Sequence, residues 1–228
     1  MKPTETLARA TAPDGAPLVL TRRDGVYSLS LAGQELMSSR QHGSEGDLAR
    51  LACAAIAGRP APRVLVGGLG FGYTLRAALD LLPAAATVVV CELFGFLLDA
   101  HREGLGDLAG RPLEDPRVTA TQADVRSLLG KSDLWDAILL DVDNGPWAFT
   151  QPGNEHLYSE SGLHLLRRSL LPGGVLAVWS AEPSREFEDR LRRTGFSARA
   201  ERVPPRAGAR RRHTIFLGET KVAGRERR

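Results

Sequence analysis

Acidic residues follow three of the apolar segments that the sequence predicts to be strands. Glu92 ends one of these segments, Asp124 ends the next along the chain, and Asp141 follows a third. A carboxylate accepts hydrogen bonds from hydroxyl, amino and ammonium groups, so it can hold a ribose, an adenine amino group or a cationic amine. A carboxylate at this place can also cap the helix that follows the strand, and this alternative stays open for each residue.

A glycine run separates the apolar segment 64–67 from a predicted helix at 74–82. Gly68, Gly70 and Gly72 would let the backbone approach a ligand that any Cβ atom would push away. Turns that bind dinucleotides use the spacing G-x-G-x-x-G, whereas the spacing here is G-x-G-x-G. We therefore expect S-adenosylmethionine or a related nucleoside rather than NAD, with a tight turn that binds nothing as the alternative.

Strands and helices alternate around these residues, with the periodicity that distinguishes one from the other. Alternation of this kind predicts a Rossmann-like α/β fold with a doubly wound, mainly parallel sheet and an antiparallel last strand. The expected strands lie at 64–67, 87–91, 137–140, 175–181, 197–203 and 213–219, with a further short strand within 112–124 that ends at Asp124. The expected helices lie at 45–57, 74–82, 93–105, 157–171 and 184–196.

Open α/β sheets bind their ligands at the carboxyl ends of the strands. In such a fold we expect Glu92 to hold a ribose and Asp124 to contact the adenine amino group. Asp141 is expected beside a sulfonium or an incoming amine, where a negative charge stabilises a cation.

The segment before this fold predicts a small antiparallel β unit. Apolar and polar residues alternate over 18–40, and the turn signals Asp24-Gly25 and Ala32-Gly33 interrupt them, which favours two or three strands. We divide the chain into a flexible leader (1–17), the small β unit (18–40), a nucleoside-binding catalytic domain (41–218) and a basic tail (219–228).

A helix is predicted to connect the β unit to the glycine strand. Ser44 is the expected N-cap, and Asp47 occupies the capping-box position three residues later. The segment 58–60, Gly-Arg-Pro, should end this helix.

Composition excludes several classes of protein. The chain has 228 residues, of which 43% are hydrophobic, and this suffices for one domain with an appendage. Cys53 and Cys91 lie in apolar segments and read as buried thiols, so we expect a cytoplasmic protein without structural disulfides. No spacing typical of a metal site and no apolar run of membrane-spanning length occurs in the sequence.

Basic residues concentrate at the C-terminal end of the sequence. From Arg199 onward, ten Arg or Lys stand against three Glu. No aromatic residue interleaves with the arginines of 206–212 to stack on bases, so we interpret this segment as a solvated hairpin loop and expect no nucleic-acid partner.

Several motifs resemble those of the spermidine synthase family of aminopropyltransferases, a branch of the class I methyltransferase-like fold. The motifs are VLVGGLGFGYTLR, VVVCE, DPRVTATQAD, DAILLDVDNGP and LYSESGLHLLRRSLLPGGVLAV, and the similarity extends over residues 19–217. The resemblance implies a transferase that uses S-adenosylmethionine or its decarboxylated form, with Asp141 at the catalytic position, and it implies a homodimer.

The sequence departs from the family at residues that contact the substrates. Phe71 replaces the Asp of the family's G-G-G-D-G-G motif, and Asn144 replaces the second Asp of D-S-S-D-P. The family's Tyr-Gln-Glu is missing, and Gln41, His42, Ser44 and Glu45 lie in its region. Without the Asp at position 71, an intact methionine carboxylate would meet less repulsion.

We therefore expect methyl transfer from S-adenosylmethionine to a small amine or related nucleophile. Asp141 would orient or deprotonate the acceptor, and His42 would assist, because an imidazole transfers protons near neutral pH. Residues of the loop after the fourth strand would bind the acceptor; they are Asp143, Asn144, Gln151 and Tyr158.

Other functions remain open at this point. Within the same fold, the alternatives are transfer of an aminopropyl group from decarboxylated S-adenosylmethionine and transfer of a 3-amino-3-carboxypropyl group. Outside it, the chain could be a nucleic-acid methyltransferase that uses the arginine cluster, or a non-catalytic nucleoside-binding module.

Overall fold

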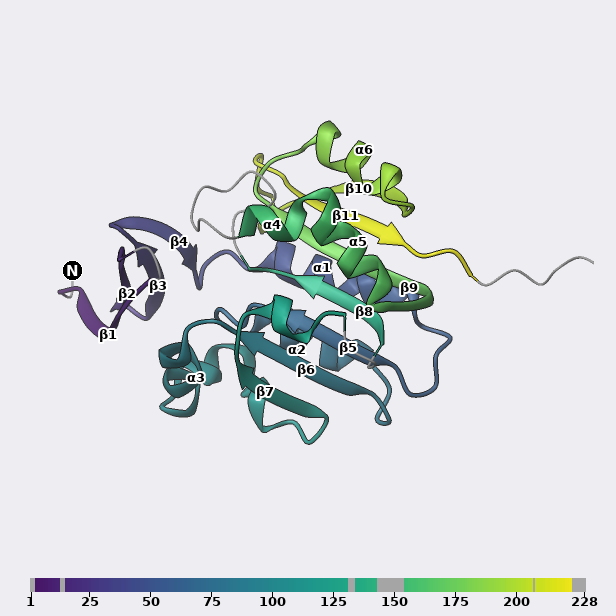
Figure 1. Ribbon diagram of the computed structural model, residues 1–228. Coiled ribbons are helices and arrows are strands. Elements are labelled where there is room, and N and C mark those ends of the chain that lie inside the picture. Colours follow the sequence, from purple (N-terminus) through teal and green to yellow (C-terminus); the bar gives the residue numbers. More distant parts are fainter. Residues whose placement is uncertain (1–2, 13–14, 131–133, 143–153, 207, 223–228) are drawn as a thin grey trace, which may run out of the picture.

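Two β-sheets and their helices make up the computed structural model, which describes residues 3–12, 15–130, 134–142, 154–206 and 208–222. A small antiparallel sheet comes first in the chain and lies at one end of a larger mixed sheet (Figure 1). The small sheet has the order β1-β2-β3-β4, and its strands are β1 (Glu5–Thr11), β2 (Pro17–Arg23), β3 (Val26–Leu31) and β4 (Gln34–Ser38).

The turn signals in the small sheet act as predicted. Asp24 and Gly25 both have positive φ angles of 48° and 78°, and Ala32 and Gly33 have 49° and 82°. Two consecutive residues with positive φ match the twist of a two-residue hairpin. The expected flexible leader (1–17) requires a correction, because Glu5–Thr11 pairs with β2 as a strand.

The large sheet has seven strands in the order β10-β11-β9-β8-β5-β6-β7. Its central strands are parallel, and β11 runs antiparallel to both of its neighbours, so the predicted Rossmann-like sheet is confirmed. The strands are β5 (Arg63–Gly67), β6 (Thr87–Glu92), β7 (Val118–Gln122), β8 (Trp135–Leu140), β9 (Leu170–Ser180), β10 (Ser197–Val203) and β11 (His213–Glu219).

Helices cover both faces of this sheet. Alternate residues of each strand belong to opposite cores: Val64 and Val66 pack with α1 and α2, whereas Leu65 packs with α4, α5 and α6. The helices are α1 (Gly43–Ala55), α2 (Tyr73–Leu81), α3 (Gly95–Arg102), α4 (Asn154–Tyr158), α5 (Glu160–Arg168) and α6 (Arg185–Arg193), with short 3-10 turns η1 (Leu105–Ala109), η2 (Pro112–Glu114) and η3 (Val125–Leu128).

A third apolar cluster attaches the small sheet to the large domain. Leu18, Leu20 and Leu29 of the small sheet pack with Leu97 of α3 and with Phe71, whose side chain is 2% exposed. The phenyl ring that replaces the family's Asp is therefore a packing element between the two sheets.

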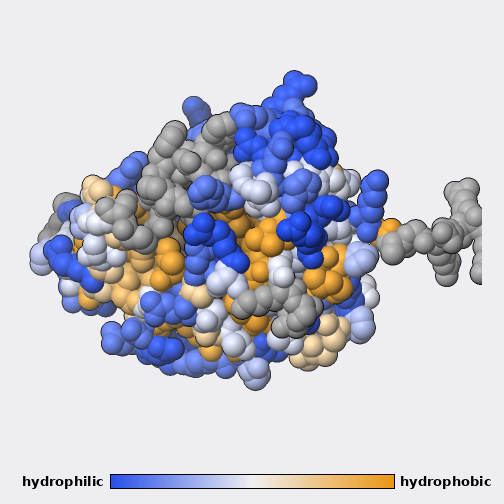
Figure 2. Space-filling view, viewed as in Figure 1, coloured by the Kyte–Doolittle hydropathy of each residue, from blue (hydrophilic) through white to orange (hydrophobic). Residues whose placement is uncertain are grey.

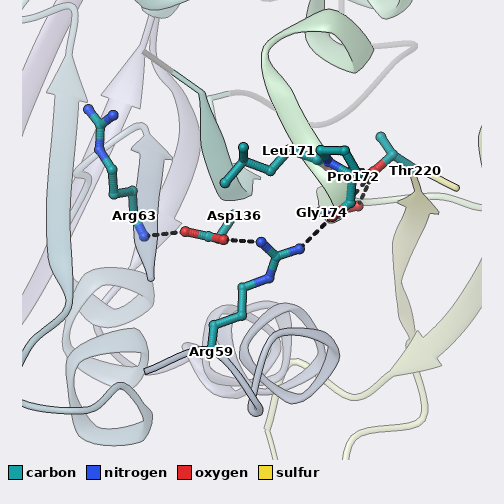
Figure 3. A network of polar contacts seen from close by, with 7 residues as sticks. All are labelled: Arg59, Arg63, Asp136, Leu171, Pro172, Gly174 and Thr220. Carbon is teal, nitrogen blue, oxygen red and sulfur yellow. Dashed lines mark hydrogen bonds and ion pairs between the residues drawn. The ribbon is translucent and has the colours of Figure 1, made fainter. Parts of the chain in front are cut away.

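A buried carboxylate connects the amino-terminal ends of three strands, which are the ends opposite to the glycine run (Figure 3). Asp136, 4% exposed at the start of β8, accepts hydrogen bonds from Arg59 Nη1 at 2.5 Å and from the Arg63 backbone N–H at 2.6 Å. Arg59 also donates to the Pro172 carbonyl at 2.7 Å. Because a buried charge is stable only when it is paired, this network fixes the segment after α1 against β5, β8 and β9.

The start of α1 differs from the prediction. The N-cap is His42 rather than Ser44, and no side chain caps this helix end. The hydroxyl of Ser44 instead contacts Glu45 and His213.

Charged side chains cover α6, whose surface is hydrophilic (Figure 2). Within the described residues, Cys53 and Cys91 are buried free thiols, as predicted. In the same part of the chain, no helix combines the length and apolarity that a membrane crossing requires.

Candidate active site

The candidate site lies where the order of the large sheet reverses. The strands β5 and β8 are neighbours, and the chain leaves them in opposite directions across the sheet. A crevice at this switch point is where open α/β folds bind ligands. Two backbone hydrogen bonds connect the carboxyl ends here, from Asp141 N–H to the Gly67 carbonyl and from Gly68 N–H to the Cys91 carbonyl, both at 2.8 Å.

The glycine run forms a turn that other residues could adopt only with strain. Gly68, Gly70 and Gly72 have φ angles of 89°, 50° and 86°. A Cβ atom on Gly68 would lie 2.1 Å from the Asp141 carbonyl oxygen, and one on Gly70 would lie 2.6 Å from the terminal methyl group of Met37. In the structure the atoms next to these glycines are a backbone carbonyl and a flexible side chain, and the predicted approach of a ligand stays a prediction.

Glu92 is a buried carboxylate that holds the glycine turn. It is 5% exposed, and it accepts hydrogen bonds from the backbone N–H groups of Leu69 at 2.9 Å and Phe94 at 2.8 Å. Burial raises the pKa of Glu92, and these N–H groups oppose the rise. The backbone N–H groups of Gly70 and Leu93 also contribute to holding this carboxylate, so its expected contact with a ribose stays a prediction.

Asp124 caps the helical turn that follows its strand, which is the alternative role for a carboxylate at a strand end. It is the N-cap of η3 and accepts a hydrogen bond from the Arg126 backbone N–H at 2.8 Å. The Arg126 guanidinium also pairs with it at 2.5 Å, and this bond lowers the pKa of Asp124. An adenine amino group would therefore share the carboxylate with Arg126, and the expected contact with adenine remains a proposal.

Asp141 lies beside a second carboxylate. The hydroxyl of Thr74, near the start of α2, donates to Asp141 Oδ2 at 2.7 Å. Glu45, half-buried in the first turn of α1, has a pKa raised to about 7 by burial and by the charge of Asp141. Two carboxyl groups that interact in this way titrate as a coupled pair, and their negative charge favours a cation beside them.

Tyr73 connects His42 to this pair of carboxylates. The exposed His42 ring stacks on the Tyr73 ring with centroids 4.1 Å apart and an interplanar angle of 20°. Burial and the charge of Glu45 raise the pKa of Tyr73, which indicates that the phenol lies near that carboxylate. His42 therefore lies at the edge of the candidate site, and its predicted assistance to Asp141 stays a prediction.

The predicted acceptor-binding residues are only partly described. Asp143, Asn144 and Gln151 lie outside the residues that the structure describes. Tyr158 is 2% exposed and packs edge-on against Phe187, with ring centroids 5.7 Å apart. The role of Tyr158 in binding an acceptor stays a prediction, and the burial of the ring does not favour it.

The sequence did not assign a role to several residues of this cluster. Glu45 and Ser44 lie in the region where the family has Tyr-Gln-Glu, and this position in the sequence was a sign that they could belong to the site. Thr74 and His213 carried no signal, because only the fold brings α2 and β11 to the same place.

In its fold, the chain is similar to proteins of the Rossmann-like, class I methyltransferase-like class. Glycines and carboxylates lie at the switch point of its sheet. No family model matches the chain. Among solved structures, the spermidine synthase of Thermotoga maritima has a TM-score of 0.72 at 18% identity, covering 96% of this chain and 74% of that one. A spermidine synthase in complex with the transition-state analogue AdoDATO has a TM-score of 0.70, also at 18% identity, with 96% and 73% covered. At this identity the likeness shows the fold alone.

Sequence comparison finds relatives within one branch of this fold. Polyamine aminopropyltransferase 2 of Pseudomonas aeruginosa is 34% identical over 124 residues, which are 52% of this chain and 33% of that protein. A polyamine aminopropyltransferase of Synechococcus sp. is 31% identical over 121 residues, which are 51% and 36% of the two chains. The chain thus spans about a third of the length of the curated relatives it matches. These relatives confirm the predicted resemblance to the polyamine aminopropyltransferases.

Proposed function

We propose that this protein transfers an aminopropyl group from decarboxylated S-adenosylmethionine to a small amine. The observation that carries the proposal is the carboxylate of Asp141 directly after β8, which accepts a hydrogen bond from Thr74 at 2.7 Å and whose charge raises the pKa of Glu45 on α1. The named relatives are aminopropyltransferases, which supports the same reaction. Methyl transfer was the main expectation from the sequence and aminopropyl transfer was its alternative. The proposal adopts the alternative.

The charge of the site favours the decarboxylated donor. That donor carries a sulfonium and an ammonium group but no carboxylate, so both of its charges are attracted to Asp141 and Glu45. An intact S-adenosylmethionine adds a carboxylate that these residues would repel. The argument for the intact donor depended on Phe71, whose ring packs between the two sheets.

The glycine turn and Glu92 would hold the nucleoside. The donor would lie against the turn of Gly68, Gly70 and Gly72, and the Glu92 carboxylate that holds this turn would accept the ribose hydroxyl hydrogens. Asp124 would reach the adenine amino group beside Arg126. The proposed acceptor site includes Asp141, Glu45 and His42. The sequence assigns Asp143, Asn144 and Gln151, which lie outside the described residues, to the same role.

The chemistry needs one proton to be removed from the acceptor. An alkylammonium has no lone pair, so it must lose a proton before its nitrogen can attack the carbon next to the sulfonium. As the new C–N bond forms, the C–S bond breaks and a neutral thioether leaves. The carboxylate pair attracts the ammonium, accepts its proton and stabilises the positive charge until the sulfonium is consumed.

Calorimetric titration of the purified protein tests the donor. We expect decarboxylated S-adenosylmethionine to bind more tightly than S-adenosylmethionine, and we expect no binding of NAD. Glu92→Gln should weaken donor binding by about tenfold to a hundredfold, because it removes charge-assisted hydrogen bonds. Tight binding of S-adenosylmethionine alone would contradict aminopropyl transfer and favour methyl transfer. Binding of neither compound would favour the non-catalytic alternative.

The homodimer that the resemblance implies is part of the same proposal. Light scattering on the eluate of a sizing column measures the mass directly. We expect twice the mass of the 24.6 kDa chain, and a single-chain mass at assay concentration would contradict it.

A further inference from the structure

A chain of hydrogen bonds leads from the carboxylate pair to a histidine on another part of the fold. Ser44, 1% exposed in the first turn of α1, donates its hydroxyl hydrogen to Glu45 Oε2 at 2.7 Å. The Nδ1 atom of His213, the first residue of β11, lies 3.0 Å from the same Ser44 oxygen. The three side chains form a continuous polar path in a buried part of the molecule.

The backbone holds this path in place. The Gly43 N–H donates to the Pro205 carbonyl at 2.8 Å, and a Cβ atom on Gly43 would lie 3.1 Å from that oxygen. The first turn of α1 therefore lies directly against the segment between β10 and β11. Because Ser44 caps no helix end, its hydroxyl is available to bridge a carboxyl group and an imidazole.

The groups around His213 favour a neutral ring that can take up a proton. Burial and the neighbouring Arg211 lower the pKa of His213, and Glu182 opposes them. From β9, the Trp179 ring packs edge-on against the imidazole, with centroids 4.7 Å apart. Arg211 and Glu182 pair with each other at 3.3 Å and have exposed side chains, so the charged neighbours of the half-buried His213 reach solvent.

We propose that Ser44 and His213 form a proton relay that removes from Glu45 the proton released by the acceptor amine. Protonated Glu45 donates to the Ser44 oxygen, while Ser44 passes its own hydrogen to His213 Nδ1. The ring that accepts this hydrogen carries its own hydrogen on Nε2. The imidazolium so formed releases its Nε2 proton to water and keeps the hydrogen on Nδ1, where it donates to the Ser44 oxygen; exchange with water returns the ring to the Nε2–H tautomer before the next turnover. The net change is one proton from the acceptor ammonium to solvent, which balances the neutral thioether and the alkylated ammonium product.

The relay rests on the proposed transfer reaction, but it assigns roles to residues that contact neither donor nor acceptor. Ser44 and His213 act through Glu45. Their loss should slow the proton-dependent step without changing donor binding, whereas a purely structural role would change binding or folding.

Steady-state kinetics of three relay variants and two control variants tests the relay. Ser44→Ala and His213→Gln should each lower kcat by roughly tenfold to a hundredfold, with the KM for the donor unchanged, and the double variant should lose no more than either single variant. The matched controls are Ser197→Ala and His164→Gln, which change exposed residues on β10 and α5. In the wild type, turnover in heavy water should be slower than in water, and both relay variants should change this solvent isotope effect.

The outcomes separate the relay from the reaction. The relay is wrong, and the reaction stands, if the wild type turns over and both single variants keep its rate. The same conclusion follows if the loss of kcat in the double variant equals the product of the losses in the two single variants. A wild type inactive with every nucleoside donor would overturn both. Nitrogen-15 NMR of His213 adds a measurement that needs no turnover: Ser44→Ala should change its tautomer ratio, and an unchanged ratio would contradict the hydrogen-bonded path.

Discussion

Replacement of Glu45 by Gln should stabilise the protein at alkaline pH. In the native state the pKa of Glu45 rises from 4.5 to about 7, chiefly because the carboxyl group is buried and also because Asp141 is charged. A group whose pKa is raised by folding binds its proton more tightly in the native state, so native stability falls as the pH rises between the two values. Each pH unit between these values lowers the free energy of unfolding by about 1.4 kcal/mol. For a half-buried pair this gives a total decrease of about 2 to 3 kcal/mol.

Unfolding by urea across the pH range measures this effect. Glu45→Gln cannot ionise and keeps an oxygen that accepts the Ser44 hydrogen bond. Its stability relative to wild type should therefore be about 2 to 3 kcal/mol higher at about pH 8 than at about pH 4. For a chain of this size the difference corresponds to roughly 4 to 12 °C in Tm. The same variant should lose most of its transfer activity, because it cannot accept the proton.

A matched control is available on an exposed helix end. Glu103 follows α3 and is exposed, so Glu103→Gln should shift stability equally at both pH values. If Glu45→Gln behaves like this control, the carboxylate pair does not exist in solution, and the argument for a cation-binding site fails.

Three further perturbations follow from the same contacts. Asp141→Asn should lower the transfer rate by about 100-fold or more, as expected on losing an acid-base group. Carbon-13 NMR of the same variant should show a lower pKa for Glu45, because the charge of Asp141 no longer raises it. Gly68→Ala should unfold the turn or the protein, since its Cβ atom would lie 2.1 Å from a backbone oxygen at a φ of 89°; normal expression and Tm would contradict the geometry. Asp136→Ala should lower the free energy of unfolding by about 3 kcal/mol, because Arg59 loses its buried partner; an unchanged urea midpoint would show that the network adds no stability.

Much of the large sheet could be predicted because its strands are buried on both faces. Continuous apolar runs such as 64–67 and 137–140 leave few alternatives to a central parallel strand. The glycines at 68, 70 and 72 marked the turn because glycine adopts positive φ angles without the strain that a side chain adds. The strand β1 was missed, since its residues are largely exposed and it is held by backbone pairing to β2 rather than by apolar burial.

The site was harder to predict because its residues come from distant parts of the chain. Asp141 and Glu92 could be found as carboxylates at strand ends. The role of Glu45 depends on the packing of α1 against the sheet, which brings it beside Asp141, and no local pattern contains that information. Phe71 was expected to face the donor, but the small sheet covers it, so the side-chain direction depended on a contact between domains.

Identification of the group that is transferred tests the central claim most directly. The purified protein would be incubated with a diamine and with either decarboxylated S-adenosylmethionine or S-adenosylmethionine, and the acceptor would be analysed by mass spectrometry. We expect the diamine to gain an aminopropyl group from the decarboxylated donor and to remain unchanged with the intact one. A diamine that gains a methyl group from S-adenosylmethionine, and nothing from the decarboxylated donor, would contradict the account.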